Sequence, residues 1–198
     1  MDKIKTFLND VKDFIDPYCA APWTVKINIP ITIILVALSA PLYWLMTGEE
    51  VPLVFRFLWF ANIGIHEVGH PIFNWISFGN EFMRYAGGTL AEILVPAGAL
   101  FYFLRQGKSL QADVCFTWLG YSFYSIGHYA KSTSLPEVTL LNAGPDTISD
   151  WEYFHDYFGT ELYDITIGHI FYCFSAVIIV FGIYCFFYHI THMRKRRL

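Results

Sequence analysis

Long apolar runs constrain the fold of this chain more than any other feature of its sequence. Residues 27–47 form a run with no charged side chain. About 20 apolar residues in a helix cross the roughly 30 Å hydrocarbon core of a bilayer. Because backbone groups in lipid must be hydrogen-bonded within their own segment, such runs are expected to be helical despite internal prolines. We identify five of them, at residues 27–47, 51–78, 86–104, 112–130 and 165–190.

The composition agrees with a protein whose solvent is partly lipid. Hydrophobic residues make up 55% of the 198 residues and charged residues only 15%, whereas soluble domains carry about 25% charged residues. This balance argues against a soluble enzyme, and the formal net charge of −4 argues against a nucleic-acid partner. The sequence therefore predicts an all-α, polytopic helix bundle of about five spans. Its expected localisation is multi-pass in a cell or inner membrane, with the lipid bilayer as a partner.

Two further segments have patterns that differ from the spans. Residues 3–16 place apolar side chains on one helical stripe with charged side chains around it. This pattern predicts an amphipathic helix in the membrane interface, and a soluble helix packing on its own loops is the alternative. Ser149 and Glu152 predict a capped helix start within an acidic loop. The chain thus divides into an interfacial segment (residues 1–26), a membrane-embedded domain (27–190) and a basic tail (191–198). The membrane-embedded domain includes an acidic extramembrane loop at residues 131–164.

The second apolar run contains the motif H-E-x-x-H, as His66-Glu67-Val68-Gly69-His70. Residues four apart on a helix lie on one face, so His66 and His70 can offer two imidazole nitrogens to one metal ion. Glu67 can then reach a water molecule on that metal and accept its proton, which suits zinc-assisted hydrolysis. Ionisable groups at lipid depth are costly unless they bind something. The alternative is a polar hydrogen-bonded cluster between helices, without metal.

Small residues and a proline accompany the motif. Pro71 cannot donate a backbone hydrogen bond and its ring clashes with the carbonyl of Glu67, so we expect a kink there. Gly64 and Gly69 allow close approach of another backbone or of a substrate. Gly87 and Gly88, in the third run, predict either close helix contact or a break in the helix.

These landmarks carry a resemblance to a known family. HEVGH within a membrane span resembles the site-2 protease family of intramembrane zinc metalloproteases. More closely, the chain resembles uncharacterised bacterial multi-span membrane proteins whose three landmarks read here HEVGHPIF, GGTLAEILVP and SDWEYF, over roughly residues 52–170. The resemblance implies a zinc metallopeptidase that cleaves a membrane protein or peptide substrate. The chain departs from it in lacking an Asp-Gly pair, and in having Ser149 where His-Asp-Trp would place a histidine.

A catalytic zinc site takes three protein ligands and one water molecule, so a third ligand is needed. Asp150 ranks first because it begins a predicted helix and occupies the position expected from the resemblance. Glu92, a carboxylate within the third run, ranks second, and His128 and His155 follow. Asp146 stands in a Gly-Pro turn, where aspartate is ordinary. The predicted site therefore consists of a catalytic base and three ligands to Zn²⁺: Glu67, His66, His70 and Asp150.

Other polar residues have mainly structural interpretations. Asn62 and Asn74 lie four residues before and after the histidines of the motif. They predict hydrogen bonds between helices, with binding of a substrate backbone as the alternative. His169, His189 and His192 lie in or after the last run and are interpreted as structural or interfacial.

Three other functions compete with the peptidase hypothesis. A non-proteolytic or inactive scaffold or chaperone could keep the metalloprotease-like fold, and the Ser149 departure favours it. A transporter could use Glu67 and Glu92 as ion relays. A di-iron oxidase would need several clustered histidine motifs, whereas the chain has one pair and scattered single histidines.

Overall fold

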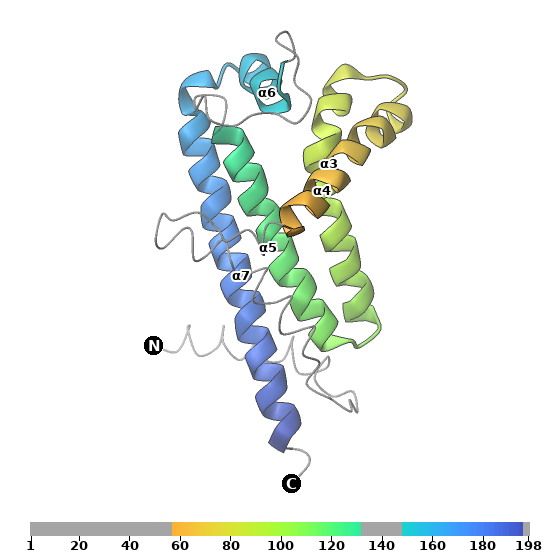
Figure 1. The fold of residues 1–198 in the computed structure, drawn as a ribbon, viewed down its shortest axis with the longest axis vertical. Helices are drawn as coiled ribbons and strands as arrows, with labels where there is room; N and C mark the ends of the chain where they lie inside the picture. Colours follow the sequence, from red (N-terminus) through yellow and green to blue (C-terminus); the bar gives the residue numbers. More distant parts are fainter. Residues whose placement is uncertain (1–56, 132–147, 196–198) are drawn as a thin grey trace, which may run out of the picture.

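The described part of the protein is entirely helical. The computed structural model describes residues 57–131 and 148–195, which form five α-helices and one 3₁₀ helix (Figure 1). This confirms the all-α expectation. The helices are α3 (Phe57–Ile76), α4 (Glu81–Arg105), α5 (Ser109–Lys131), α6 (Asp150–Phe158), η2 (Glu161–Tyr163) and α7 (Asp164–Lys195).

Several expectations fall outside the described residues. They are the interfacial helix at 3–16, the first apolar run at 27–47 and the position of Asp146. Most of the acidic loop, at residues 132–147, and the last three residues of the basic tail also lie outside. The remaining four runs can be compared with the structure.

Two segments are long and apolar enough to cross a membrane, Glu81–Arg105 and Glu161–His189. Only 33% of the apolar window in each is buried inside the structure, so most of these residues do not lie in a protein core. The described parts of the runs at 51–78 and 112–130 form α3 and α5. These two helices are not apolar enough over their described residues to count as candidate membrane spans. The prediction of five spans is therefore confirmed in part. For α3 the reason is a series of polar residues along its length: Asn62, His66, Glu67, His70 and Asn74.

The long helices form two antiparallel pairs joined side by side. α5 packs along α7, α3 packs on α4, and the contact between α4 and α5 joins the pairs (Figure 1). Glycines allow the first pair to approach closely, because a Cβ atom on Gly127 would lie 2.8 Å from the carbonyl oxygen of Gly168. A Cβ atom on Gly120 would lie 2.5 Å from the Ile179 side chain. Small residues at such contacts are typical of helix association in lipid.

A tight turn reverses the chain between α3 and α4. Phe78 and Gly79 both adopt positive φ angles, of 57° and 84°. Asn80 then caps α4 by accepting a hydrogen bond from the Met83 backbone N–H at 3.0 Å. Gly79 fits here because glycine has no Cβ penalty at positive φ. The turn brings the second half of α3 back against the first half of α4.

The crossing of α3 and α4 depends on glycines at the point of contact. A Cβ atom on Gly69 would collide with the carbonyl oxygen of Gly87, and one on Gly87 would lie 2.7 Å from the carbonyl oxygen of Gly69. The prediction of close helix contact at this Gly-Gly pair is thus confirmed. α3 continues through Pro71 and α4 through Pro96, so neither helix ends at its proline.

Candidate metal centre

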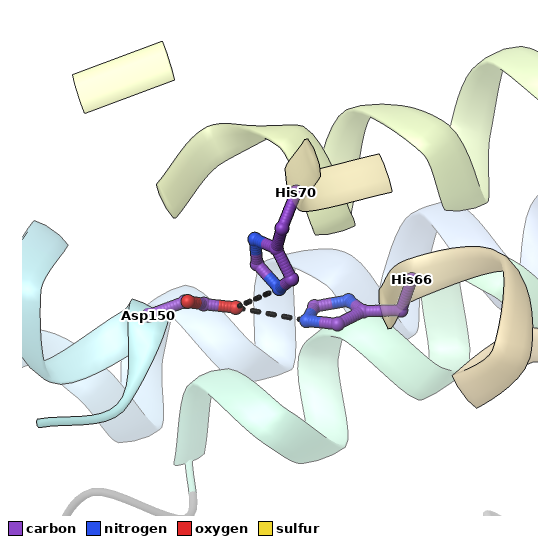
Figure 2. Close-up of side chains that lie close together, drawn as sticks. All are labelled: His66, His70 and Asp150. Carbon is purple, nitrogen blue, oxygen red and sulfur yellow. Dashed lines mark hydrogen bonds and ion pairs between the residues drawn. The ribbon is translucent and has the colours of Figure 1, made fainter. Parts of the chain in front are cut away.

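The two histidines of the motif lie on one face of α3, as the helical spacing predicts. The ring centroids of His66 and His70 are 4.8 Å apart and the rings are nearly perpendicular, at 80°. His66 is buried, with 7% of its surface exposed, and His70 is half-buried. Both rings turn toward the start of α6 (Figure 2).

Asp150 comes to these rings from α6, 80 residues further along the chain than His70. It is the first residue of that helix, behind the N-cap Ser149. The predicted capping box is present, because Ser149 accepts from the Glu152 backbone N–H and the Glu152 side chain accepts from the Ser149 N–H. The cap fixes the direction in which α6 begins. Asp150 is thereby held at the end of the helix that faces α3.

The three side chains form a compact group. Asp150 Oδ2 lies 2.8 Å from His66 Nε2 and 3.3 Å from His70 Nε2 (Figure 2). One ligand atom from each residue lies within 4.8 Å of the other two, so the group could hold a metal ion. Ligand atoms about 2.0–2.1 Å from a tetrahedral zinc ion are about 3.4 Å apart from one another. The 3.3 Å separation is close to that value, the 2.8 Å contact is shorter, and the group as a whole extends to 4.8 Å, so the side chains would have to shift to enclose an ion.

The far nitrogens of both histidines are held by acceptors outside the group. His66 Nδ1 lies 3.0 Å from Glu92 Oε1, and His70 Nδ1 lies 2.8 Å from the backbone oxygen of Arg84. With Nδ1–H donating to these acceptors, Nε2 is the nitrogen that faces the group. The Nε2–H of His66 donates to Asp150 in this arrangement, and a metal ion would have to displace that proton. Metal-binding histidines are commonly oriented in this way by a carboxylate or a carbonyl. The donor set and its supports therefore fit a metal ion.

Glu92, the second candidate for the third ligand, does not lie where a ligand would lie. It is buried in α4, with 5% of its surface exposed, and it contacts the His66 nitrogen that points away from Asp150. It is therefore placed to orient the ring rather than to join His66 Nε2, His70 and Asp150. Its other oxygen has no hydrogen-bond partner among the described residues.

The ionisation of Asp150 suits a ligand. Burial alone would raise the pKa of the Asp150 carboxyl, but hydrogen bonds from His66 and His70 lower it. Their combined effect exceeds that of burial, so the pKa of Asp150 lies below its ordinary value. Asp150 is therefore a carboxylate at neutral pH, which is the form that binds metal ions.

Gly88 shapes the place of the His66 ring. A Cβ atom on Gly88 would lie 2.5 Å from His66 Cε1 and Nε2. The ring therefore sits directly on the α4 backbone, one residue beyond the contact between Gly69 and Gly87. The Gly-Gly landmark thus has two roles, since one glycine sets the crossing of the helices and the other makes room for the imidazole.

Glu67 follows His66 in the sequence, and Tyr129 lies beside the group. Glu67 is exposed on α3, and its role as a base stays a prediction. The edge of the Tyr129 ring meets His66 with centroids 5.6 Å apart at 70°, and the Asp150 backbone N–H donates to the Tyr129 hydroxyl at 3.4 Å. Our sequence reasoning missed Tyr129 because aromatic residues near span ends are common at membrane interfaces. It belongs to no motif, so only the packing of α5 could reveal it.

The other candidate histidines lie elsewhere. His128 Nδ1 is 3.3 Å from the Tyr172 hydroxyl, between α5 and α7. His155 is buried, with its ring nitrogens 3.0 Å from Thr160 Oγ1 and 3.3 Å from the Ala130 carbonyl oxygen. Neither belongs to the three-residue group. Both have local hydrogen-bond partners that account for their positions.

Asn62 forms hydrogen bonds between helices, which is the role that the sequence predicts for it. It is fully buried and joins α3 to α5. Its amide donates to Ser122 Oγ at 3.2 Å, and its oxygen accepts from Trp118 Nε1 at 3.0 Å. These bonds use both ends of the amide. Hydrogen bonding between helices is therefore confirmed for Asn62.

Comparison with known proteins does not add a family to this geometry. The chain matches no protein-family model, no curated protein and no solved structure. The resemblance to site-2 proteases therefore rests on the motif residues alone and stays a hypothesis. The established features are the helical fold, two segments that could cross a membrane, and a His-His-Asp group that could hold a metal ion.

Proposed function

We propose that this protein is a membrane-embedded, zinc-dependent hydrolase that acts as an intramembrane peptidase. The observation that carries the proposal is the convergence of His66, His70 and Asp150, with Glu67 next to the first of them in sequence. Two imidazoles and one carboxylate leave a fourth tetrahedral position open. Catalytic zinc sites keep such a position for water and substrate, whereas structural sites fill it with protein.

The choice of zinc rests on the donor set together with the motif. Imidazole nitrogen and carboxylate oxygen are both common zinc ligands. The same set of two histidines and one carboxylate also serves non-haem Fe(II) enzymes. In H-E-x-x-H a glutamate directly follows the first ligand and can act as a general base. Hydrolysis needs such a base, whereas oxygen chemistry at iron does not. Metal analysis is therefore part of the test.

The residues of this chain would divide the work of hydrolysis among them. A bound divalent cation polarises a carbonyl group and lowers the pKa of water. His66, His70 and Asp150 would hold the cation, while Glu92 and the Arg84 carbonyl keep both rings in the required orientation. Glu67 would accept a proton from the attacking water and deliver it to the amine nitrogen that leaves. The products are a carboxylate and an amine.

The surroundings of the group favour a membrane substrate. His66 lies against Gly88 in α4, which is one of the two segments long and apolar enough to cross a bilayer. A group at this position is within reach of a peptide segment that enters from lipid or from the membrane interface. The proposed substrate is therefore a membrane protein or a membrane-associated peptide.

The experiment that tests this proposal compares two glutamates. Purified protein is reconstituted in phosphatidylcholine vesicles with a pool of synthetic single-span peptides, and the products are read by mass spectrometry. Glu67→Gln should keep stoichiometric zinc and lose cleavage by about 10²–10⁴-fold, the usual contribution of a general base. Glu81→Gln, an exposed glutamate at the start of α4, should behave as the unmodified protein.

Three results would contradict the proposal. Cleavage that persists unchanged in Glu67→Gln would remove the base from the reaction. Stoichiometric iron in place of zinc would favour oxygen chemistry. Protein that binds no metal, cleaves none of the peptides and keeps its fold in His66→Ala would favour a scaffold or chaperone.

A further inference from the structure

We infer that the candidate metal group lies in the extracytoplasmic half of the membrane, at the end of the helical bundle that faces away from the cytoplasm. The observation behind the inference is an unequal distribution of lysine and arginine between the two ends of the bundle. As a statement about an active site it deepens the proposed hydrolase function and rests on it, because it fixes the side from which a substrate arrives. The placement itself can be tested without any reaction.

The two helices that could cross the membrane run in the same direction. α5 is antiparallel to α7, because Gly127 lies against Gly168 near one end of this pair and Asp113 contacts His189 near the other. α4 is antiparallel to α5, because the two helices pack together and only residues 106–108 connect them. α4 and α7 therefore both begin at one end of the bundle and finish at the other (Figure 1).

The metal group belongs to the end at which α4 and α7 begin. Asp150 opens α6, and His155 of α6 lies 3.3 Å from the carbonyl oxygen of Ala130 in the last turn of α5. The His66 ring lies against Gly88 in α4. At about 1.5 Å per residue, Gly88 is about 10 Å from the start of α4 and about 25 Å from its end. The group is therefore much nearer to one membrane surface than to the other.

The opposite end of the bundle is basic. Four basic residues stand at the end of α4, in the α4–α5 connection and at the end of α7: Arg105, Lys108, Arg194 and Lys195. Two further arginines follow α7 directly in the sequence. Within the described residues no carboxylate pairs with Arg105 or Lys108. Arg105 instead lies over the exposed ring of Phe101, 4.9 Å from its centre, as basic and aromatic side chains do where a span leaves the membrane.

The end with the metal group has fewer basic residues. The long connection from α5 to α7, at residues 132–164, contains no lysine or arginine. Among the described residues, Arg84 and Lys131 are the basic residues at this end. Arg84 is paired with Glu81, with Arg84 Nη2 3.7 Å from Glu81 Oε1. The difference between the two ends is therefore one of number and also of neutralisation.

Lysine and arginine are in excess in the cytoplasmic loops of membrane proteins, and the excess is counted in short loops and close to the ends of spans. The basic residues at both ends of this bundle meet that condition. The cytoplasmic leaflet is also negatively charged and attracts basic segments beside a span. The four lysines of residues 1–26 lie outside the described residues, so the rule is applied to the ends of α4, α5 and α7. It places the basic end at the cytoplasmic face and the metal group in the other half.

This placement narrows the proposed substrate. His66, His70 and Asp150 would act on a peptide bond that lies in the extracytoplasmic half of the bilayer. A membrane protein whose susceptible segment lies close to the cytoplasmic face would not reach them. The soluble product would be released on the extracytoplasmic side.

The experiment labels one cysteine at each end of the bundle in spheroplasts of a bacterial expression host. Gln106→Cys reports on the basic end and Glu161→Cys on the end with the metal group. Both positions are exposed, and neither substitution removes a basic residue. Cys19→Ser and Cys173→Ser are added to both variants, and the two remaining cysteines are buried. The chain with these two serine substitutions alone is the control and should label weakly throughout.

A membrane-impermeant maleimide should label Glu161→Cys in intact spheroplasts, and should label Gln106→Cys only after permeabilisation. The expected difference between the two variants in intact spheroplasts is about tenfold. A second measurement leaves the chain unsubstituted. A fluorescent protein that matures only in the cytoplasm, and an alkaline phosphatase that folds only outside it, are fused in turn to Leu198. The first fusion should be fluorescent and the second inactive, because the basic tail is expected in the cytoplasm.

The reverse labelling pattern, or an active phosphatase fusion without fluorescence, would overturn the inference. Equal labelling of both positions in intact spheroplasts would also overturn it, because the chain would then have no fixed orientation. Labelling of both positions only after permeabilisation would place both ends in the cytoplasm and have the same consequence. None of these results depends on metal or on cleavage. Failure of the hydrolase proposal, read from Glu67→Gln, is therefore distinct from failure of this placement.

Discussion

Buried histidine–carboxylate pairs occur at two ends of this helical bundle, and they differ in one instructive respect. Near α6, His66 contacts Glu92 through one ring nitrogen and Asp150 through the other. At the opposite end, His189 Nδ1 lies 2.7 Å from Asp113 Oδ2, between α7 and α5. Its Nε2 has no hydrogen-bond partner in the described part of the chain.

The difference shows what a metal group needs beyond a buried pair. His66 has a second imidazole one helical turn away and a carboxylate delivered by another helix, whereas the described residues bring no comparable third ligand to His189 and Asp113. A single pair links two helices and satisfies buried polar atoms. Three ligand atoms that converge from separate elements can enclose an ion. The comparison predicts that substitutions at the two ends have different consequences.

The largest effect is expected from removing one histidine at each end. His66→Ala should abolish stoichiometric zinc binding, because two ligands alone do not complete a catalytic site. His189→Ala should leave zinc binding intact and destabilise the fold by about 3–5 kcal/mol, since it leaves Asp113 buried without its partner. Elemental analysis and chemical denaturation measure the two effects. Zinc loss in His189→Ala would show that the two ends are not independent.

An intermediate effect is expected from two glycines of α4. Gly88→Ala places a methyl group 2.5 Å from the His66 ring and should weaken zinc binding by about 10–100-fold, as when other supports of a ligand are removed. Gly98→Ala meets nothing within 4 Å and should leave zinc affinity unchanged. Competition with a chromophoric chelator measures both affinities. Equal affinities in the two variants would mean that contact with α4 does not hold the ring.

The smallest effect is expected from removing the metal. Because Asp150 belongs to α6 and the histidines to α3, a bound ion would tie the two helices together. Chelation should therefore raise amide exchange in α6 several-fold and leave the lower part of α7, around His189, unchanged. Hydrogen exchange read by mass spectrometry resolves the two regions. A uniform change throughout the chain would indicate a global effect rather than a local link.

Local patterns in the sequence were enough to predict several features of the site. The facing rings of His66 and His70 follow from helical spacing, and the capped start of α6 follows from Ser149 and Glu152. The close contact at Gly87 follows from its lack of a side chain. Each of these depends on backbone geometry within a few residues, or on residue size, and both can be read directly from a sequence.

Other features required the packing of distant segments. The sequence left Asp150 and Glu92 as competing carboxylates, and only the structure shows that they meet opposite nitrogens of His66. The helical period says which residues share a face, but not which face another helix will meet. Tyr129 had no signal at all, because a tyrosine near a span end is ordinary.

The sequence by itself determined that this chain is helical and apolar, and that one of its helices carries two imidazoles on a single face. Both properties arise from interactions within a few residues, together with the preference of apolar side chains for a non-aqueous environment. Only the tertiary structure decided which carboxylate faces the two rings and which one supports His66 from behind. Those relations join residues separated by 26 to 84 positions, so they depend on how whole helices cross.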